Sequence, residues 1–269
     1  MTTARILIVA GSDSGGGAGI QADIKTVTMW GGHAMTAITA ITAQNTLGVE
    51  GVHAIPPALV TQQMACVARD IGVDAVKIGM LGDAAIASAV ADDLDGAAYP
   101  DAIVLDPVMI ATSGATLADA ATIAAMERLA RRAAVVTPNL PELAALCGRV
   151  ALAADEVAGA ATGYAARVGS AVLVKGGHAD GVTVVDRLFD RSGEVARWEN
   201  RRIETRHTHG TGCTLASAIA NGLAVGMALP VAIERAIAFV RASLEHAPGL
   251  GHGHGPMGQQ DATGFACRG

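Results

Sequence analysis

The stretch with the clearest chemical potential runs from Arg206 to Cys213 with the sequence Arg-His-Thr-His-Gly-Thr-Gly-Cys. Gly210 and Gly212 flank a threonine, and apolar residues then recur at four-residue spacing from Leu215 to Leu223. This pattern predicts a tight loop that begins an amphipathic helix. The first N–H groups of a helix have no intrahelical partners and lie at the positive end of its dipole. A glycine loop at this place is therefore a candidate anion site, above all for phosphate.

Cys213 would lie in the field of that helix start. Such a position favours the thiolate, so we expect the helix to lower the pKa of Cys213 and to make it a base or a nucleophile. The competing interpretation is a glycine-containing loop before a buried helix, with Cys213 as a small core residue. Short glycine motifs match by chance too often for this stretch to decide between the two.

Four further polar clusters each follow a short apolar run of the kind that forms a buried strand. They are Gly11-Ser12-Asp13, Asp106-Pro107, Thr137-Pro138-Asn139 and Lys175-Gly176-Gly177-His178. The carboxyl ends of parallel strands lie at one edge of a sheet, where open α/β folds bind ligands. That edge would combine carboxylates (Asp106, Glu142), a cation (Lys175) and the anion loop. Phosphoryl transfer requires this inventory, because positioning and charge stabilisation do most of its catalysis.

The elements that position these clusters alternate along the chain. Strands are predicted at 6–10, 34–43, 74–78, 102–105, 134–136 and 171–174, with a more exposed pair at 182–189 and 195–199. Helices are predicted at 20–29, 57–71, 117–131, 155–168 and 230–246, with two more ending near residues 94 and 226. Such alternation predicts an α/β fold with a largely parallel sheet and helices on both faces. We expect a single domain over residues 1–249, a flexible tail over 250–269, and a glycine loop at 11–19 that is either a mobile flap or a close backbone approach.

The composition narrows the class of protein. Half of the 269 residues are hydrophobic and only 3% are aromatic, so the core must consist of Ala, Val, Ile and Leu. A net charge of −6 gives no general attraction for nucleic acid or an anionic membrane. The apolar run at the N-terminus is too short for a signal peptide, and the uncharged stretch 209–234 is interrupted by glycine and proline. The four cysteines (Cys66, Cys147, Cys213, Cys267) form no Cys-x-x-Cys pair, which argues against structural zinc. We expect a cytoplasmic enzyme.

Seven motifs together resemble a known family over residues 6–246. They are 11–23 (GSDSGGGAGIQAD), 43–46 (AQNT), 77–80 (KIGM), 106–108 (DPV), 137–142 (TPNLPE), 175–178 (KGGH) and 207–213 (HTHGTGC). In this combination the chain closely resembles the hydroxymethylpyrimidine/phosphomethylpyrimidine kinases of thiamine biosynthesis, in the ribokinase-like superfamily. The resemblance implies a three-layer α/β/α sandwich and two successive ATP-dependent phosphorylations of one small pyrimidine.

The resemblance also implies a substrate pocket. Its residues would be Gln44 and Asp23 as polar partners of the aminopyrimidine, with Met80, Val108 and Gly11 as walls. A glutamine amide both donates and accepts, as a ring nitrogen beside an exocyclic amine requires. Without the resemblance, Gln44 would be a strand-end residue that caps a turn, Asp23 a solvated helix residue, and Met80 and Val108 core.

The resemblance also implies which residues bind ATP, phosphate and the metal ion. The implied ATP and phosphate ligands are Asn139, Lys175, Thr208, Gly210 and Gly212, and the implied catalytic set is Cys213, Gly210, Thr211, Gly212 and Lys175. Asp106 and Glu142 would hold Mg²⁺, in part through water, because this ion keeps several waters. The residues alone also allow a structural role for each. Glu142 would be a first-turn acid that the helix dipole favours after Pro141, and Lys175 would be a lysine at a strand end that reaches solvent.

Several alternatives remain open at this point. The general superfamily has an aspartate base where this chain has Cys213, and the pyrimidine kinases share this departure, so the thiol would act as a base or as a positioning group. A pyridoxal or pyridoxine kinase of the same fold is the nearest alternative. A thiol hydrolase or acyltransferase that uses Cys213 as nucleophile, and a nucleotide-binding regulator without catalysis, are the others. We expect a small-molecule substrate and a homodimer, with neither nucleic acid nor membrane as partner.

Overall fold

The protein folds around a single mixed sheet. The computed structural model describes residues 3–96, 99–109, 120–178 and 181–266. Within them nine strands form one sheet in the order β3-β2-β1-β4-β5-β6-β7-β8-β9. The strands are β1 Arg5–Asp13, β2 His33–Asn45, β3 Gly48–Ala54, β4 Ala75–Ile78, β5 Ile103–Leu105, β6 Val135–Val136, β7 Ala171–Val174, β8 Thr183–Asp190 and β9 Gly193–Arg201.

The centre of the sheet is parallel, and only its two margins are antiparallel. From β2 through β1, β4, β5 and β6 to β7 every neighbouring pair is parallel, whereas β3 pairs antiparallel with β2, and β8 and β9 form an antiparallel hairpin beside β7. The predicted α/β fold with a largely parallel sheet is therefore confirmed. Strand β3 was not predicted.

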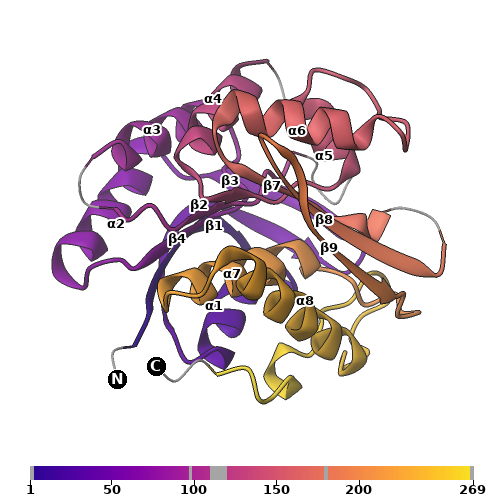
Figure 1. Ribbon diagram of the computed structural model, residues 1–269. Coiled ribbons are helices and arrows are strands. Elements are labelled where there is room, and N and C mark those ends of the chain that lie inside the picture. The colour runs from indigo at the N-terminus through magenta and orange to yellow at the C-terminus, as the bar shows by residue number, and fades with distance from the viewer. Residues whose placement is uncertain (1–2, 97–98, 110–119, 179–180, 267–269) are drawn as a thin grey trace.

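Helices cover both faces of the sheet, which gives three layers (Figure 1). Helices α1 (Gly19–Met29), α7 (Thr211–Ala224) and α8 (Leu229–Glu245) lie on the face that is lower in Figure 1. The upper face carries α2 (Pro57–Asp70), α3 (Ala84–Leu94), α4 (Ala120–Arg132), α5 (Leu140–Leu146) and α6 (Val157–Val168). Two separate apolar clusters fill the space between the sheet and each helical layer. The predicted three-layer arrangement is thus present.

Local sequence explains most of these elements. The run from Ile6 to Ala10 is completely buried, as expected for a central strand with helices on both faces. Asp83 begins α3 because its Oδ1 accepts a hydrogen bond of 2.8 Å from the backbone N–H of Ile86. Gly169 ends α6 in the left-handed conformation with φ of 78°, which suits glycine. The helix predicted at 117–131 is present from Ala120 onward, and its first three residues lie outside the described part of the chain.

The uncharged stretch before Glu234 forms two helices, α7 and α8, separated by a turn at Gly226. In the part of the chain that the structure describes, no helix is both long and apolar enough to cross a membrane.

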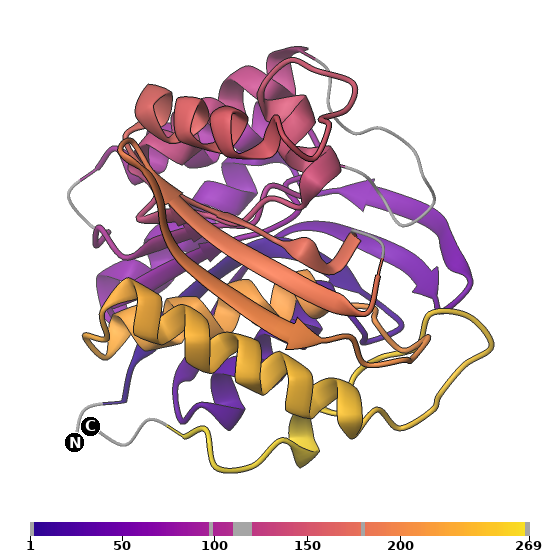
Figure 2. The same ribbon diagram turned by 45° about the vertical axis from the view of Figure 1, so that its right-hand side comes forward.

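The segment after Gly249 packs on the domain, where the sequence analysis expected a flexible tail. The backbone N–H of Gly253 lies 3.2 Å from Oγ1 of Thr46 in the turn between β2 and β3, and Figure 2 shows the tail passing beside that turn. Further along, the buried Gln259 donates from Nε2 to Oγ1 of Thr214 in α7 over 3.1 Å, and Met257 is buried. These contacts depend on partners far away in the sequence, so composition alone could not predict them, and the flexibility of the tail stays a prediction. Cys267 lies outside the described residues.

Candidate active site

The start of α7 lies against the charged groups at the carboxyl ends of β5 and β7. Gly210 is the N-cap of α7 with φ of 89°, and the N–H of Thr211 donates to the carbonyl of the exposed Thr208 over 3.3 Å. A Cβ atom on Gly212 would lie 3.3 Å from both Oδ2 of Asp106 and Nζ of Lys175. Because this position is glycine, the first turn of α7 leaves room beside these two charges. The predicted convergence of sequence-distant clusters is therefore real.

Lys175 joins two carboxylates at this place. Its Nζ lies 2.7 Å from Oδ1 of Asp106 and 3.7 Å from Oε2 of Glu142. Burial alone would raise the pKa of Asp106, but Lys175, Lys77 and the hydrogen bonds from Lys175 and Thr137 outweigh it and lower this pKa. For Glu142 burial prevails over Lys175, and the neighbouring Asp106 adds to it, so its pKa is raised. The two carboxyl groups are thus unequal, and Asp106 is the one held ionised.

Glu142 has a structural task as well. It forms a capping box at the start of α5, in which Oδ1 of Asn139 accepts from the N–H of Glu142 over 2.9 Å. In return, Oε2 of Glu142 accepts from the N–H of Asn139 over 2.8 Å. The structural interpretation of Glu142 as a first-turn acid is therefore correct in part, although the same carboxylate also lies near Lys175.

A pocket of about 140 Å³ opens next to the start of α7. It combines four of the five predicted substrate residues with Cys213. The lining residues from the prediction are Gly11, Gln44, Met80, Val108 and Cys213. Gly11 allows a close approach, because a Cβ there would lie 2.4 Å from Cε of Met80. Cys213 in this lining directly follows Gly212, so adjacent residues of α7 lie at the pocket and at the charged cluster of Asp106 and Lys175.

Asp23 is the predicted substrate residue that is not in this lining. It is completely buried, and its Oδ2 accepts from Nζ of Lys77 over 2.9 Å while its Oδ1 accepts from Oγ of Ser217 over 2.7 Å. Lys77, also completely buried, lines the pocket in its place. Asp23 thus has two partners within the protein, and its contact with the pyrimidine stays a prediction. Sequence reasoning missed Lys77 because a lysine within a short strand looks like a surface residue.

Cys213 differs from the expected low-pKa thiol. Burial raises the pKa of Cys213 to about 11, with Asp23 and Asp106 acting in the same direction, although Lys77 and a backbone hydrogen bond with Gly19 oppose them. The expectation that the pKa of Cys213 is lowered is wrong, because loss of hydration outweighs Lys77 and the backbone hydrogen bond. At neutral pH Cys213 is a thiol that can donate a hydrogen bond, which makes it a poor covalent nucleophile.

We therefore expect slow alkylation of Cys213 at neutral pH in the protein without ligands. A raised pKa keeps the reactive thiolate scarce below it, so the rate with iodoacetamide should climb with pH until about 11. Site-resolved mass spectrometry between neutral and strongly alkaline pH measures this profile, with the exposed Cys66 as an accessibility control. A plateau reached near neutral pH would contradict the assignment.

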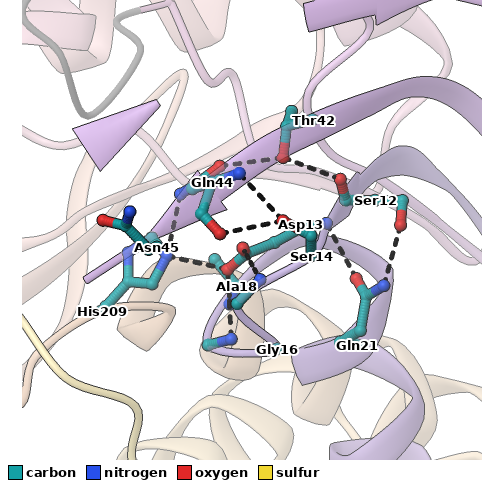
Figure 3. Close-up of polar contacts among 12 residues, drawn as sticks. Ser12, Asp13, Ser14, Gly16, Ala18, Gln21, Thr42, Gln44, Asn45 and His209 are labelled. Carbon is teal, nitrogen blue, oxygen red and sulfur yellow. Dashed lines mark hydrogen bonds and ion pairs between the residues drawn. The ribbon is translucent and has the colours of Figure 1, made fainter. Parts of the chain in front are cut away.

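The glycine loop that follows β1 is wrapped around a carboxylate. Oδ1 of Asp13 accepts from the N–H of Gly15, and its Oδ2 accepts from the N–H groups of Gly17 and Ala18, over 2.8 to 3.1 Å. The same Oδ2 lies 2.9 Å from Nε2 of His209, as Figure 3 shows. These contacts bind the loop to Asp13, and the choice between a mobile flap and a close backbone approach stays a prediction.

Asp13 and His209 both line the pocket, and neither was assigned to it from the sequence. Their contact joins segments 196 positions apart, so no local signal could find it. A larger surface groove of about 560 Å³ lies between β9 and α8, and none of the predicted site residues is in its lining.

Comparisons with known proteins agree with this architecture. The family model for phosphomethylpyrimidine kinase matches residues 13–258. The hydroxymethylpyrimidine/phosphomethylpyrimidine kinase of Rhizobium meliloti is 48% identical over 260 residues, which are 95% of this chain and 96% of that protein. The thiamine biosynthesis bifunctional protein of Geobacter sulfurreducens is 47% identical over 94% of this chain, which spans only 51% of its length.

A solved structure, the ADP complex of the pyridoxal kinase of Bacillus subtilis, superimposes with a TM-score of 0.88 at 33% identity. The superposition covers 97% of this chain and 98% of that one. This likeness supports the ribokinase-like fold implied by the motifs. The chain belongs to the phosphomethylpyrimidine kinase family.

Proposed function

We propose that this protein transfers the terminal phosphoryl group of ATP to the hydroxymethyl group of 4-amino-5-hydroxymethyl-2-methylpyrimidine and then to the resulting monophosphate. The observation that carries the proposal is the junction of the pocket and the charged cluster at residues 212 and 213. Cys213 lines the pocket, whereas Gly212 leaves room beside Asp106 and Lys175. A hydroxyl group in the pocket would thus face a phosphate at the helix start.

The phosphoryl group and the substrate hydroxyl group would contact different parts of the site. Backbone N–H groups at the start of α7 and the ammonium of Lys175 would stabilise charge on the transferring phosphoryl group. The thiol of Cys213 would position the substrate hydroxyl group by a hydrogen bond. A loose transition state needs little prior deprotonation, so a thiol with a high pKa is compatible with the reaction.

The donor set fits a magnesium ion that the nucleotide brings with it. Asp106 and Glu142 offer hard oxygen ligands beside the start of α7, and Asp106 is held ionised. Among the described residues no three His, Cys, Asp or Glu side chains gather as a complete metal site. We therefore propose that Asp106 and Glu142 contact Mg²⁺ partly through water, and that phosphate oxygens complete its shell. The ion would supply charge neutralisation during transfer.

The test is an assay that follows both phosphorylated products with ATP and the hydroxymethylpyrimidine, next to pyridoxine as competing substrate. The likeness to a pyridoxal kinase makes pyridoxine the relevant alternative. We expect ADP to form only when an acceptor is present, and kcat/KM to favour the pyrimidine. A clear preference for pyridoxine would assign the protein to the alternative, and absence of transfer to either would overturn the proposal.

A further inference from the structure

The C-terminal segment 251–259 contacts two different sides of the candidate active site. Its first part lies on the turn between β2 and β3, where the N–H groups of His252 and Gly253 each lie 3.2 Å from Oγ1 of Thr46 (Figure 2). Thr46 directly follows Asn45, the last residue of β2, and both β2 and β3 contribute side chains to the pocket lining. This part of the segment therefore lies on the hairpin that borders the pocket.

The second part of the same segment contacts the chain at the start of α7. The backbone N–H of His209 donates to the carbonyl oxygen of Gly255 over 3.3 Å. Further along, the side chain of the buried Gln259 donates from Nε2 to Oγ1 of Thr214, in the first turn of α7, over 3.1 Å. The segment thus contacts the chain on both sides of the glycine loop at 210–212, where phosphate is proposed to bind.

Two glycines allow the segment to lie this close to its neighbours. A Cβ atom on Gly253 would collide with the carbonyl oxygen of Thr46, and one on Gly255 would collide with Nδ1 of His207 and with the carbonyl oxygen of Leu250. Backbone atoms cannot move aside as the end of a flexible side chain can. The glycines in the sequence Gly-His-Gly-His-Gly at 251–255 are therefore suited to packing on the hairpin and on the loop before α7.

We propose that residues 251–259 form a strap that positions the start of α7 relative to the β2–β3 hairpin. The inference rests on the proposed function, in which the phosphate groups of ATP lie at the start of α7 and the pyrimidine lies beside the hairpin. Phosphoryl transfer depends on the alignment of these two partners, so a small displacement of one side lowers the rate strongly. Gly253 and Gln259 are then positioning residues, which act through Thr46 and Thr214.

The kinetic test compares the parent protein with Gly253→Ala and Gln259→Met, with the hydroxymethylpyrimidine as acceptor. The added methyl group of Gly253→Ala would displace the strap from the hairpin, and Gln259→Met removes the donor to Thr214 with little change in shape. For both variants we expect kcat/KM for ATP to fall about 10-fold or more, in part through a higher KM for ATP. Loss of folded protein would lower the apparent kcat and leave this KM unchanged, so KM separates positioning from unfolding.

The matched control is Gly48→Ala, in the same hairpin. Among the described residues, a Cβ atom on Gly48 would have no neighbour within 4 Å, so this variant should keep the parent KM for ATP. A further variant, Thr46→Val, removes the oxygen that accepts from the strap with little change in shape. It should raise the KM for ATP in the same direction, and it provides the test if Gly253→Ala does not fold.

Hydrogen exchange of the ligand-free protein gives a measurement without turnover. In the parent, peptides that cover 251–259 should be protected, and in Gly253→Ala peptides that cover 251–259 and 207–213 should both exchange faster. Unprotected peptides over 251–259 in the parent, which a flexible tail predicts, would overturn the inference. A parent KM for ATP in both Gly253→Ala and Gln259→Met would overturn it as well. If the parent protein phosphorylates no acceptor, the proposed function fails instead, and exchange over 207–213 still decides whether the strap positions this loop.

Discussion

Replacing Gly212 with alanine is expected to leave the protein at least as stable as the parent while lowering kcat/KM about 100-fold. Gly212 lies in the first turn of α7, where alanine gains up to ~1 kcal/mol over glycine in helix propensity. The added Cβ would lie 3.3 Å from Asp106 Oδ2 and from Lys175 Nζ, in the space proposed for phosphate. Displacement of a reacting group by about 1 Å is enough for a loss of this size.

The matched control is Gly163→Ala. Gly163 is an exposed glycine inside α6, and a Cβ there would have no neighbour within 4 Å. It should gain the same helix propensity and keep the parent activity. Urea unfolding and steady-state kinetics of both variants give the comparison. Full activity of Gly212→Ala would mean that the space beside Asp106 and Lys175 is not used for phosphate.

The central elements of the fold could be predicted from the sequence because their signals are local. Buried strands such as β1 and β5 contain short apolar runs followed by glycine or a polar residue, and this order alone placed Asp106 and Lys175 at one edge. Strand β3 gave no such signal, since most of its side chains are exposed or partly exposed and it pairs only at the margin of the sheet. Its exposure removed the apolar alternation on which such a prediction depends.

The site was predicted less completely because several of its residues are held by partners that lie far away in the sequence. Asp23 and Lys77 are 54 positions apart, and His209 and Gln44 are 165 apart. Taken singly, each is a polar residue of an ordinary kind, and only the contact reveals its role. The predicted lowering of the pKa of Cys213 was wrong for a related reason. The sequence shows that Cys213 lies at a helix start, but it does not show how far the thiol is buried.

Breaking the ion pair between Lys77 and Asp23 is expected to be the most damaging single change to stability. Both side chains are completely inaccessible to solvent, and 2.9 Å separates Nζ of Lys77 from Oδ2 of Asp23. Lys77→Met would leave the Asp23 carboxyl group with Ser217 as its remaining hydrogen-bond donor. Loss of one partner of a buried pair costs about 3–5 kcal/mol, because the other group stays buried without compensation. Urea unfolding at neutral pH measures this loss.

A double variant distinguishes an uncompensated charge from a simple loss of packing. In Lys77→Met/Asp23→Asn no charge remains at either position, so the double variant should be less destabilised than the sum of the two single variants, by roughly 1 kcal/mol or more. Strictly additive losses would contradict the view that pairing dominates at this place. Arg128→Met, which removes an exposed ion pair with Asp92, should hardly shift the unfolding midpoint.

If these results hold, Asp23 acts by holding an ammonium group at the pocket wall, since Lys77 lines the pocket and Asp23 does not.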